Sequence, residues 1–147
     1  MNIMYLDPDP VVCPTLLCDQ HLLAQINEAR LALEGKWPNH PVTKWAWKNR
    51  SHWLWLWCFA VNCCIEYAKR FGKCHASTDR IMSMIVDDRV EDLSKTEVEI
   101  ECPSWHGDYP DYASYLRARH AEWIRDGKRP AKWTGGRVPQ WAQEASP

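Results

Sequence analysis

The sequence predicts an all-α fold, and three observations support this prediction. Apolar residues recur at helical spacing over long segments, and glycines and prolines separate these segments. The length of 147 residues suits one domain, and 46% of the residues are hydrophobic, ten of them tryptophans. We therefore predict a compact single-domain helical bundle over residues 1–147, with a basic, tryptophan-bearing tail from about residue 127.

The first predicted helix spans residues 15–34 and stops at Gly35. One apolar stripe with helical spacing is expected to face the core: Leu22, Ile26, Ala29 and Leu33. A polar stripe lies roughly 100° away around the same helix: His21, Gln25 and Glu28. Because this stripe borders the buried one, we expect a functional site there, half exposed to water.

The second predicted helix spans residues 45–70 and ends at Gly72, and Ser51 is predicted to cap its longer portion. It is apolar on every side, as expected of a central helix. A short helix is predicted at 78–86, and residues 98–101 form a strand or an extended segment. The last helix begins with Asp111 as its N-cap and ends at Gly127. Its inward residues are predicted to be Tyr112, Tyr115, Leu116, Arg119 and Trp123.

The charges are segregated along the chain, although the net charge is only −1. Acidic residues dominate 79–101, whereas basic residues dominate 115–137. A dedicated duplex-DNA binder usually carries a clear net positive charge, which this chain lacks. The charges are compatible either with DNA binding through one basic face or with a small phosphorylated substrate. The longest apolar stretch, residues 53–65, is too short to cross a membrane, and no signal sequence is apparent. We expect a cytoplasmic protein with no membrane partner.

Seven cysteines cannot all pair within the chain, and none forms a C-x-x-C motif. The nearest approach to a metal-ligand group is Cys13, Cys18 and His21. Buried reduced thiols are the better interpretation for an intracellular protein. We expect neither a metal nor a cofactor.

The first predicted helix contains the run Leu17-Cys18-Asp19-Gln20-His21-Leu22, followed seven residues after the histidine by Glu28. This run resembles the phage pyrimidine-dimer DNA glycosylase (endonuclease V) family. Further matching elements occur in the family's order near the end of the chain: Gly107-Asp108-Tyr109, Ala113-Ser114 and Arg129-Pro130 before Trp133. Asn39-His40-Pro41 and residues 67–72 resemble uncharacterised phage relatives, and this implies a phage-infected bacterial host.

The resemblance implies a compact all-α fold and base excision from DNA. In the family an N-terminal α-amino group attacks the sugar C1′ and forms a Schiff base. The position of Glu28 corresponds to the family's catalytic glutamate. A carboxylate suits this chemistry because cleavage of an N-glycosidic bond builds positive charge on the sugar.

Two departures from the family put its Schiff-base lyase chemistry in doubt. Asn2 has a side chain large enough for Met1 to be retained, and the segment before the Asp19 run is longer than in the family. We expect this segment to displace the family's amine, with Asp7 where the amine-bearing residue would lie. A hydrolytic glycosylase, in which Glu28 and Asp7 or Asp19 activate water, fits better.

The candidate residues fall into two groups, each with a structural alternative. The candidate catalytic residues are Glu28, His21 and Asp19. The candidate substrate-binding residues are Gln20, Gln25, Asn39, His40, Lys44, Arg117, Arg119 and Lys128. Asp19 can instead favour the helix start through the helix dipole, and the basic residues can form a solvated face. Lys44 lies among tryptophans that stack on bases or pack in the core.

Two other functions remain open from the sequence. The same helical pocket could serve a glycosidase or binding protein for a free nucleotide, which the near-neutral charge favours. A non-catalytic phage protein could instead bind a host protein through the acidic stretch 79–101. The sequence gives no indication of the oligomeric state.

Overall fold

The structure is a computed structural model that describes residues 2–93, 96–103 and 105–143. Every regular element in these ranges is helical, which confirms the all-α prediction. None of these helices combines the length and hydropathy needed to cross a bilayer. The elements, with η for 3-10 helices, are η1 (Cys13–Leu16), α1 (Asp19–Leu33), α2 (Pro41–Ala46), α3 (Arg50–Phe71), α4 (Thr78–Ser83), η2 (Met84–Val86), α5 (Asp88–Glu91), α6 (Tyr112–Arg125) and α7 (Gln140–Gln143).

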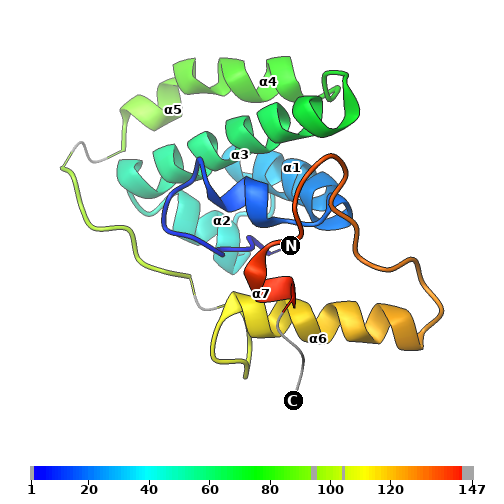
Figure 1. Cartoon of the computed structure of the whole chain (residues 1–147). Helices are drawn as coiled ribbons and strands as arrows, with labels where there is room; N and C mark the ends of the chain where they lie inside the picture. The colour runs from blue at the N-terminus through cyan, green and yellow to red at the C-terminus, as the bar shows by residue number, and fades with distance from the viewer. Residues whose placement is uncertain (1, 94–95, 104, 144–147) are drawn as a thin grey trace.

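Helices α1 and α3 pack against each other at the centre of the molecule (Figure 1). The predicted apolar stripe of α1 is at most 1% exposed along its whole length, so its inward direction is confirmed. Helix α3 contributes the fully buried Trp53 and Phe59 to the same core. It is not buried all round, however, because Ile65 is 57% exposed. Helices α4 and α5 lie along one side of α3, and α6 forms the opposite edge of the molecule.

Capping residues divide two of the predicted helices. Residues 15–34 separate into η1 and α1, because Leu17 and Cys18 are extended. Residues 45–70 separate into α2 and α3 at Asn49, whose side chain accepts the His52 backbone N–H at 2.8 Å. The predicted cap at Ser51 is therefore wrong, since Asn49 lies three residues before the N–H that needs an acceptor.

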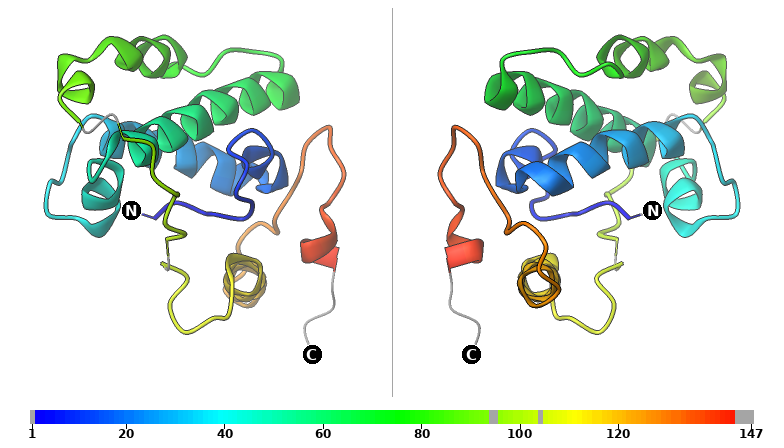
Figure 2. Two further views of the ribbon diagram at one scale, coloured as in Figure 1. Left: turned by 90° about the vertical axis from the view of Figure 1, so that its left-hand side faces the viewer. Right: turned by 90° about the vertical axis from the view of Figure 1, so that its right-hand side faces the viewer.

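The N-terminal segment, residues 2–12, lies between the α1–α3 pair and α6 (Figure 2). Ile3 is completely buried, and Tyr5 stacks on Trp55 with ring centroids 4.8 Å apart. The Trp55 indole N–H also donates to the carbonyl of Pro8 at 2.8 Å. An extended segment thus forms part of the core, held by aromatic contacts from α3.

Helix α6 begins at its predicted cap, since the Asp111 side chain accepts the Ser114 N–H at 2.7 Å. The prediction that Arg119 points inward is wrong: its side chain is 48% exposed and pairs with Glu122. The residues with i, i+4, i+8, i+11 spacing that line the inward side are Tyr112, Leu116, His120 and Trp123. Arg119 lies about 100° from His120 around the helix and therefore faces solvent.

Residues 98–101 are extended, and no strand forms in the described ranges. Side chains from α2 and α3 both form hydrogen bonds with the backbone of Glu101. Its N–H donates to His52 Nε2 at 3.2 Å, and its carbonyl accepts the Trp45 indole N–H at 3.0 Å. Lys48 and Arg50 pair with Glu101 and Glu91, so part of the acidic stretch is neutralised by the chain's own bases.

Candidate active site

Glu28 lies on α1 with its side chain half-buried. One carboxylate oxygen, Oε2, accepts two hydrogen bonds of 3.0 Å. The donors are the backbone N–H of Asn2 and the side-chain amide of Gln25. The carboxylate is therefore held in one orientation by a donor from its own helix and a donor from the start of the chain.

Gln25 joins the N-terminal segment to α1. Its side chain donates to the carbonyl of Asn2 at 2.8 Å and accepts the Met4 N–H at 2.7 Å. Gln25 is completely buried, whereas the sequence predicted a half-exposed polar stripe. That prediction is wrong for Gln25 because the N-terminal segment covers it. Its polar atoms are satisfied by backbone groups, as burial requires.

The expected displacement of the chain start from Glu28 is also wrong. The longer segment runs back along α1 and brings the Asn2 nitrogen directly to the carboxylate. Asp7, the residue expected at this place, instead accepts the Asp9 N–H at 2.8 Å in a turn. A second turn follows, in which Asp9 accepts the Val11 N–H at 2.8 Å.

A cavity of about 290 Å³ adjoins this site through Trp105. The Trp105 carbonyl accepts the Asn2 side-chain amide at 3.2 Å, while Asn2 Oδ1 is buried with no hydrogen-bond partner. The cavity wall includes Lys44, which supplies positive charge, and Lys48, which pairs with Glu101. Its other lining residues are Pro41, Trp45, Glu101, Cys102 and Pro103.

This arrangement suits stabilisation of a cation and positioning of a small polar molecule. Both hydrogen bonds to Glu28 reach Oε2, and no described residue donates to Oε1. Oε1 is thus open to a water or to the substrate. Asn2 Oδ1 is a second acceptor nearby whose bonding capacity is unused.

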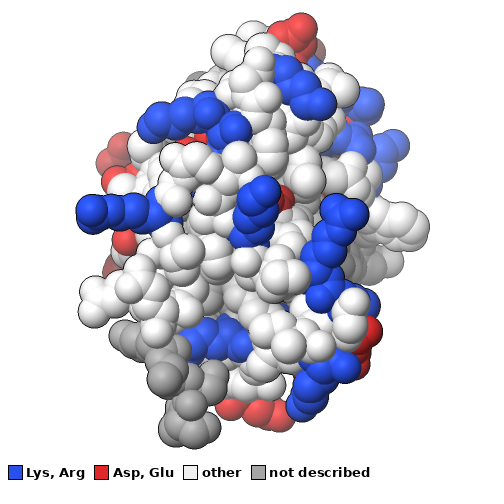
Figure 3. Space-filling view, turned by 45° about the vertical axis from the view of Figure 1, so that its right-hand side comes forward, with Lys and Arg blue, Asp and Glu red and all other residues white. Residues whose placement is uncertain are grey.

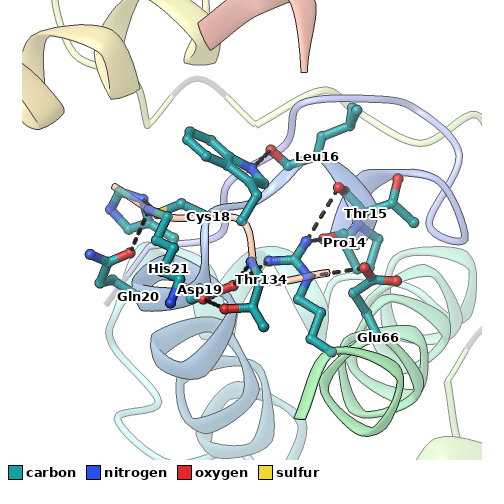
Figure 4. Close-up of polar contacts among 12 residues, drawn as sticks. Pro14, Thr15, Leu16, Cys18, Asp19, Gln20, His21, Glu66 and Thr134 are labelled. Atoms are coloured by element: carbon teal, nitrogen blue, oxygen red, sulfur yellow. Dashed lines mark hydrogen bonds and ion pairs between the residues drawn. The ribbon is translucent and has the colours of Figure 1, made fainter. Parts of the chain in front are cut away.

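Asp19 and Gln20 form a second polar cluster, shown in Figure 4. Asp19 accepts the Arg70 guanidinium at 3.1 Å, the Thr134 N–H at 3.0 Å and the Thr134 hydroxyl. Burial acts to raise the pKa of Asp19, but the hydrogen bonds from Thr134 and Arg70 outweigh it and lower the pKa below 3.8. Gln20 donates to the carbonyl of Pro130 at 2.8 Å. These contacts fasten the tail to α1.

Comparison with known proteins places the chain in a family. A family model described as pyrimidine dimer DNA glycosylase matches residues 1–80, more than half of the chain. The chain belongs to the pyrimidine dimer DNA glycosylase family. No curated protein and no solved structure gives a significant match.

The matched residues of the glycosylase family include every residue of the Glu28 hydrogen-bond cluster on α1 and the N-terminal segment. They also include Asp19, Gln20 and Arg70, but not Thr134 or Pro130 in the tail. The two stretches that resemble the family in the sequence, around Asp19 and around Arg129-Pro130, nevertheless meet in space. Asp19 lies about 13 Å along α1 from Glu28, so the two carboxylates do not share one reacting atom.

His21 lies two turns before Glu28, about 10 Å along the helix axis. Its ring contacts the Cys18 thiol and stacks near His120, with centroids 5.5 Å apart. Burial, followed by the positive fields of His120 and Arg119, lowers the pKa of His21 to about 4. The candidate catalytic residues His21, Asp19 and Glu28 therefore occupy three separate environments on one helix.

The remaining candidates are distributed over the surface. Asn39 and His40 line another cavity, and His40 Nδ1 accepts the Val42 N–H at 3.1 Å as the cap of α2. Arg117 donates to the Trp141 carbonyl at 2.8 Å, and Lys128 is exposed beyond the end of α6. Figure 3 shows a face with many Lys and Arg side chains and few acidic ones.

Sequence reasoning missed four residues that build these clusters: Asn2, Arg70, Trp105 and Thr134. Each of them contacts a residue at least 26 positions away in the chain. A contact at such a separation has no signature in the local sequence. His120 was also missed, but here a signal existed. It continues the helical spacing of Tyr112 and Leu116 and precedes Trp123 by three positions.

Proposed function

We propose that the chain is a DNA N-glycosylase of hydrolase type in which Glu28 is the catalytic carboxylate. The observation that carries this proposal is the fixed orientation of Glu28, with Oε2 held by Asn2 and Gln25 at 3.0 Å. Membership of the pyrimidine dimer DNA glycosylase family supports the substrate class. The basic face in Figure 3 supplies counter-charges for a phosphate backbone.

The chemistry follows from the charge that develops during the reaction. As the N-glycosidic bond breaks, positive charge grows on the sugar, and a preoriented carboxylate stabilises it without reorganising. Glu28 Oε1 can also accept a proton from an attacking water. Asn2 Oδ1 supplies the second acceptor that would orient this water.

Water is the nucleophile in this proposal because the Asn2 nitrogen belongs to the peptide bond with Met1. The lone pair of a peptide nitrogen is delocalised and does not attack carbon. A second candidate, the lyase reaction, is favoured by one observation. In a chain that began at Asn2, the same nitrogen would be an α-amine 3.0 Å from Glu28.

The test uses Glu28→Gln, with Glu34→Gln at the C-cap of the same helix as the matched control. Both proteins are incubated with ultraviolet-irradiated duplex DNA, undamaged duplex DNA and mixed nucleotides, and released base is measured. We expect Glu28→Gln to lose at least about 100-fold in rate while folding normally, because transition-state charge stabilisation is lost. Glu34 pairs with Arg30 and Arg80, so Glu34→Gln should keep its activity.

Other outcomes separate the alternatives. Full activity in folded Glu28→Gln contradicts the catalytic assignment, and base release from nucleotides alone favours the free-nucleotide enzyme. Binding to neither substrate favours a host-protein partner. Borohydride trapping is run in parallel on protein whose mass shows whether Met1 is present. We expect no covalent adduct when Met1 is retained, and a trapped adduct supports the lyase.

A further inference from the structure

A thiol and two imidazoles meet where α1 begins and α6 ends. Cys18 Sγ lies 3.4 Å from His21 Nδ1 and 3.7 Å from His120 Nε2. The three potential ligand atoms all lie within 4.8 Å of one another, although Cys18 and His120 are 102 residues apart. Cys18 and His21 are buried, and His120 is half-buried.

These distances match the edges of a zinc coordination tetrahedron. Zn–S bonds of about 2.3 Å and Zn–N bonds of about 2.0–2.1 Å place the sulfur about 3.6 Å from each nitrogen. The two sulfur–nitrogen distances in the structure lie on either side of this value. A single ion between the three atoms would fix the remaining separation, between the two ring nitrogens, at about 3.3 Å, and these atoms lie within 4.8 Å of each other in the structure.

The protonation of the cluster also suits a metal. Burial lowers the pKa of His120 to about 4, as it does that of His21, so both imidazoles are neutral at pH 7 and have a lone pair to donate. Burial raises the pKa of the Cys18 thiol despite hydrogen bonds from the backbone N–H groups of His21 and Gln20, so an ion that binds here has to displace the thiol proton. A thiolate at this helix N-terminus would offset the positive charge of an ion.

Aromatic rings enclose the cluster. Trp123 lies 4.9 Å from the His21 ring, and Trp141 lies 5.8 Å from the His120 ring, both between centroids. The Trp141 indole N–H is buried with no hydrogen-bond partner. Three protein ligands leave one of the four zinc positions for a water or an anion, and such a ligand needs a hydrogen-bond donor or acceptor beside it.

We propose that Cys18, His21 and His120 bind one zinc ion, which joins the start of α1 to α6. The site is separate from Glu28, which lies two turns further along α1. The ion would fix α6 against α1 and so position the basic tail that follows α6. This proposal explains a buried thiol–diimidazole cluster that the glycosidic chemistry does not use.

The test is a titration of the reduced, chelator-treated full chain with Co²⁺, followed by Zn²⁺. We expect one equivalent of Co²⁺ to produce a thiolate charge-transfer band and tetrahedral ligand-field bands, which Zn²⁺ then removes. Cys18→Ser should lose the charge-transfer band, and His120→Gln should bind Co²⁺ roughly 100-fold or more weakly. Cys64→Ser, a buried thiol on α3, is the matched control and should behave as the wild type.

A stability measurement covers the case in which Cys18→Ser fails to fold. Zn²⁺ should raise the melting temperature of the wild type and of Cys64→Ser, but not that of His120→Gln, whose side chain is only half-buried. A wild-type protein that binds no Co²⁺, or binds it without a thiolate band, overturns the proposal. Equal zinc stabilisation of wild type and His120→Gln overturns it as well.

Discussion

Replacement of Asp19 by Asn tests whether the buried ion pair holds the tail on α1. The Asp19 and Arg70 side chains are 12% and 4% exposed and lie 3.1 Å apart. Asn keeps the shape and can still accept the Thr134 N–H, but it removes the charge that Arg70 faces. Breaking a buried pair from one side typically costs about 3–5 kcal/mol, because the other charge is left uncompensated.

The expected cost is smaller here because Arg70 has a second carboxylate. Glu66 pairs with Arg70 Nε at 2.9 Å and stays in place when Asp19 is changed. We therefore expect Asp19→Asn to lower the free energy of unfolding by about 2–3 kcal/mol, roughly 5–10 °C in melting temperature for a chain of this size. Glu66→Gln should cost about 1 kcal/mol, because Arg70 then keeps Asp19.

Urea unfolding of both single variants and of the double variant provides the measurement. The double variant should lose more than the sum of the two, since Arg70 would then be a buried charge without a carboxylate. The pH dependence gives a second check. Because the folded pKa of Asp19 lies below 3.8, its stabilisation is present above that pH and is lost as the pH falls through the folded pKa. Additive losses, or a wild-type advantage that does not shrink as the pH falls below 3.8, would refute this account.

Four further substitutions test the N-terminal segment and the basic face. Gln25→Leu should reduce the free energy of unfolding by about 2–4 kcal/mol, because it leaves buried backbone groups unsatisfied, and hydrogen exchange should show the N-terminal segment loosened. Exposed Arg119 and Lys128, changed singly to Ala, should each weaken binding to all duplex sequences and reduce the salt slope by about one unit. Arg117→Ala should instead release Trp141 and lower stability, with the salt slope unchanged; a slope change as large as for Lys128→Ala would contradict this.

Helix α1 shows how far local pattern alone predicts this protein. Its apolar stripe, its stop at Gly35 and the placement of Glu28 one turn after Gln25 all follow from the sequence. The same holds for the Asp111 cap and for the glycine that ends α3, Gly72, which has a φ of +69°. Helical periodicity and capping depend on residues within about four positions, and the sequence contains this information directly.

Local pattern does not settle which face of α6 is buried. Arg119 and His120 are neighbours in the sequence, and a shift of one residue in helical phase exchanges which of them is buried. The prediction of an inward Arg119 is wrong because the inward face is set by the contacts of His120 with Cys18 and Trp133.

The sequence by itself determined the long helices, the ends at Gly35, Gly72 and Asp111, and the residue types that α1 carries. Only the tertiary structure decided their partners: Asn2 on Glu28, Arg70 and Thr134 on Asp19, and His120 on Cys18, pairs separated by 26, 51, 115 and 102 residues. A helix periodicity indicates which face is buried but not what covers it. That choice depends on how non-helical segments such as 2–12 and 129–134 pack, because their backbone hydrogen bonds are made with side chains of other elements.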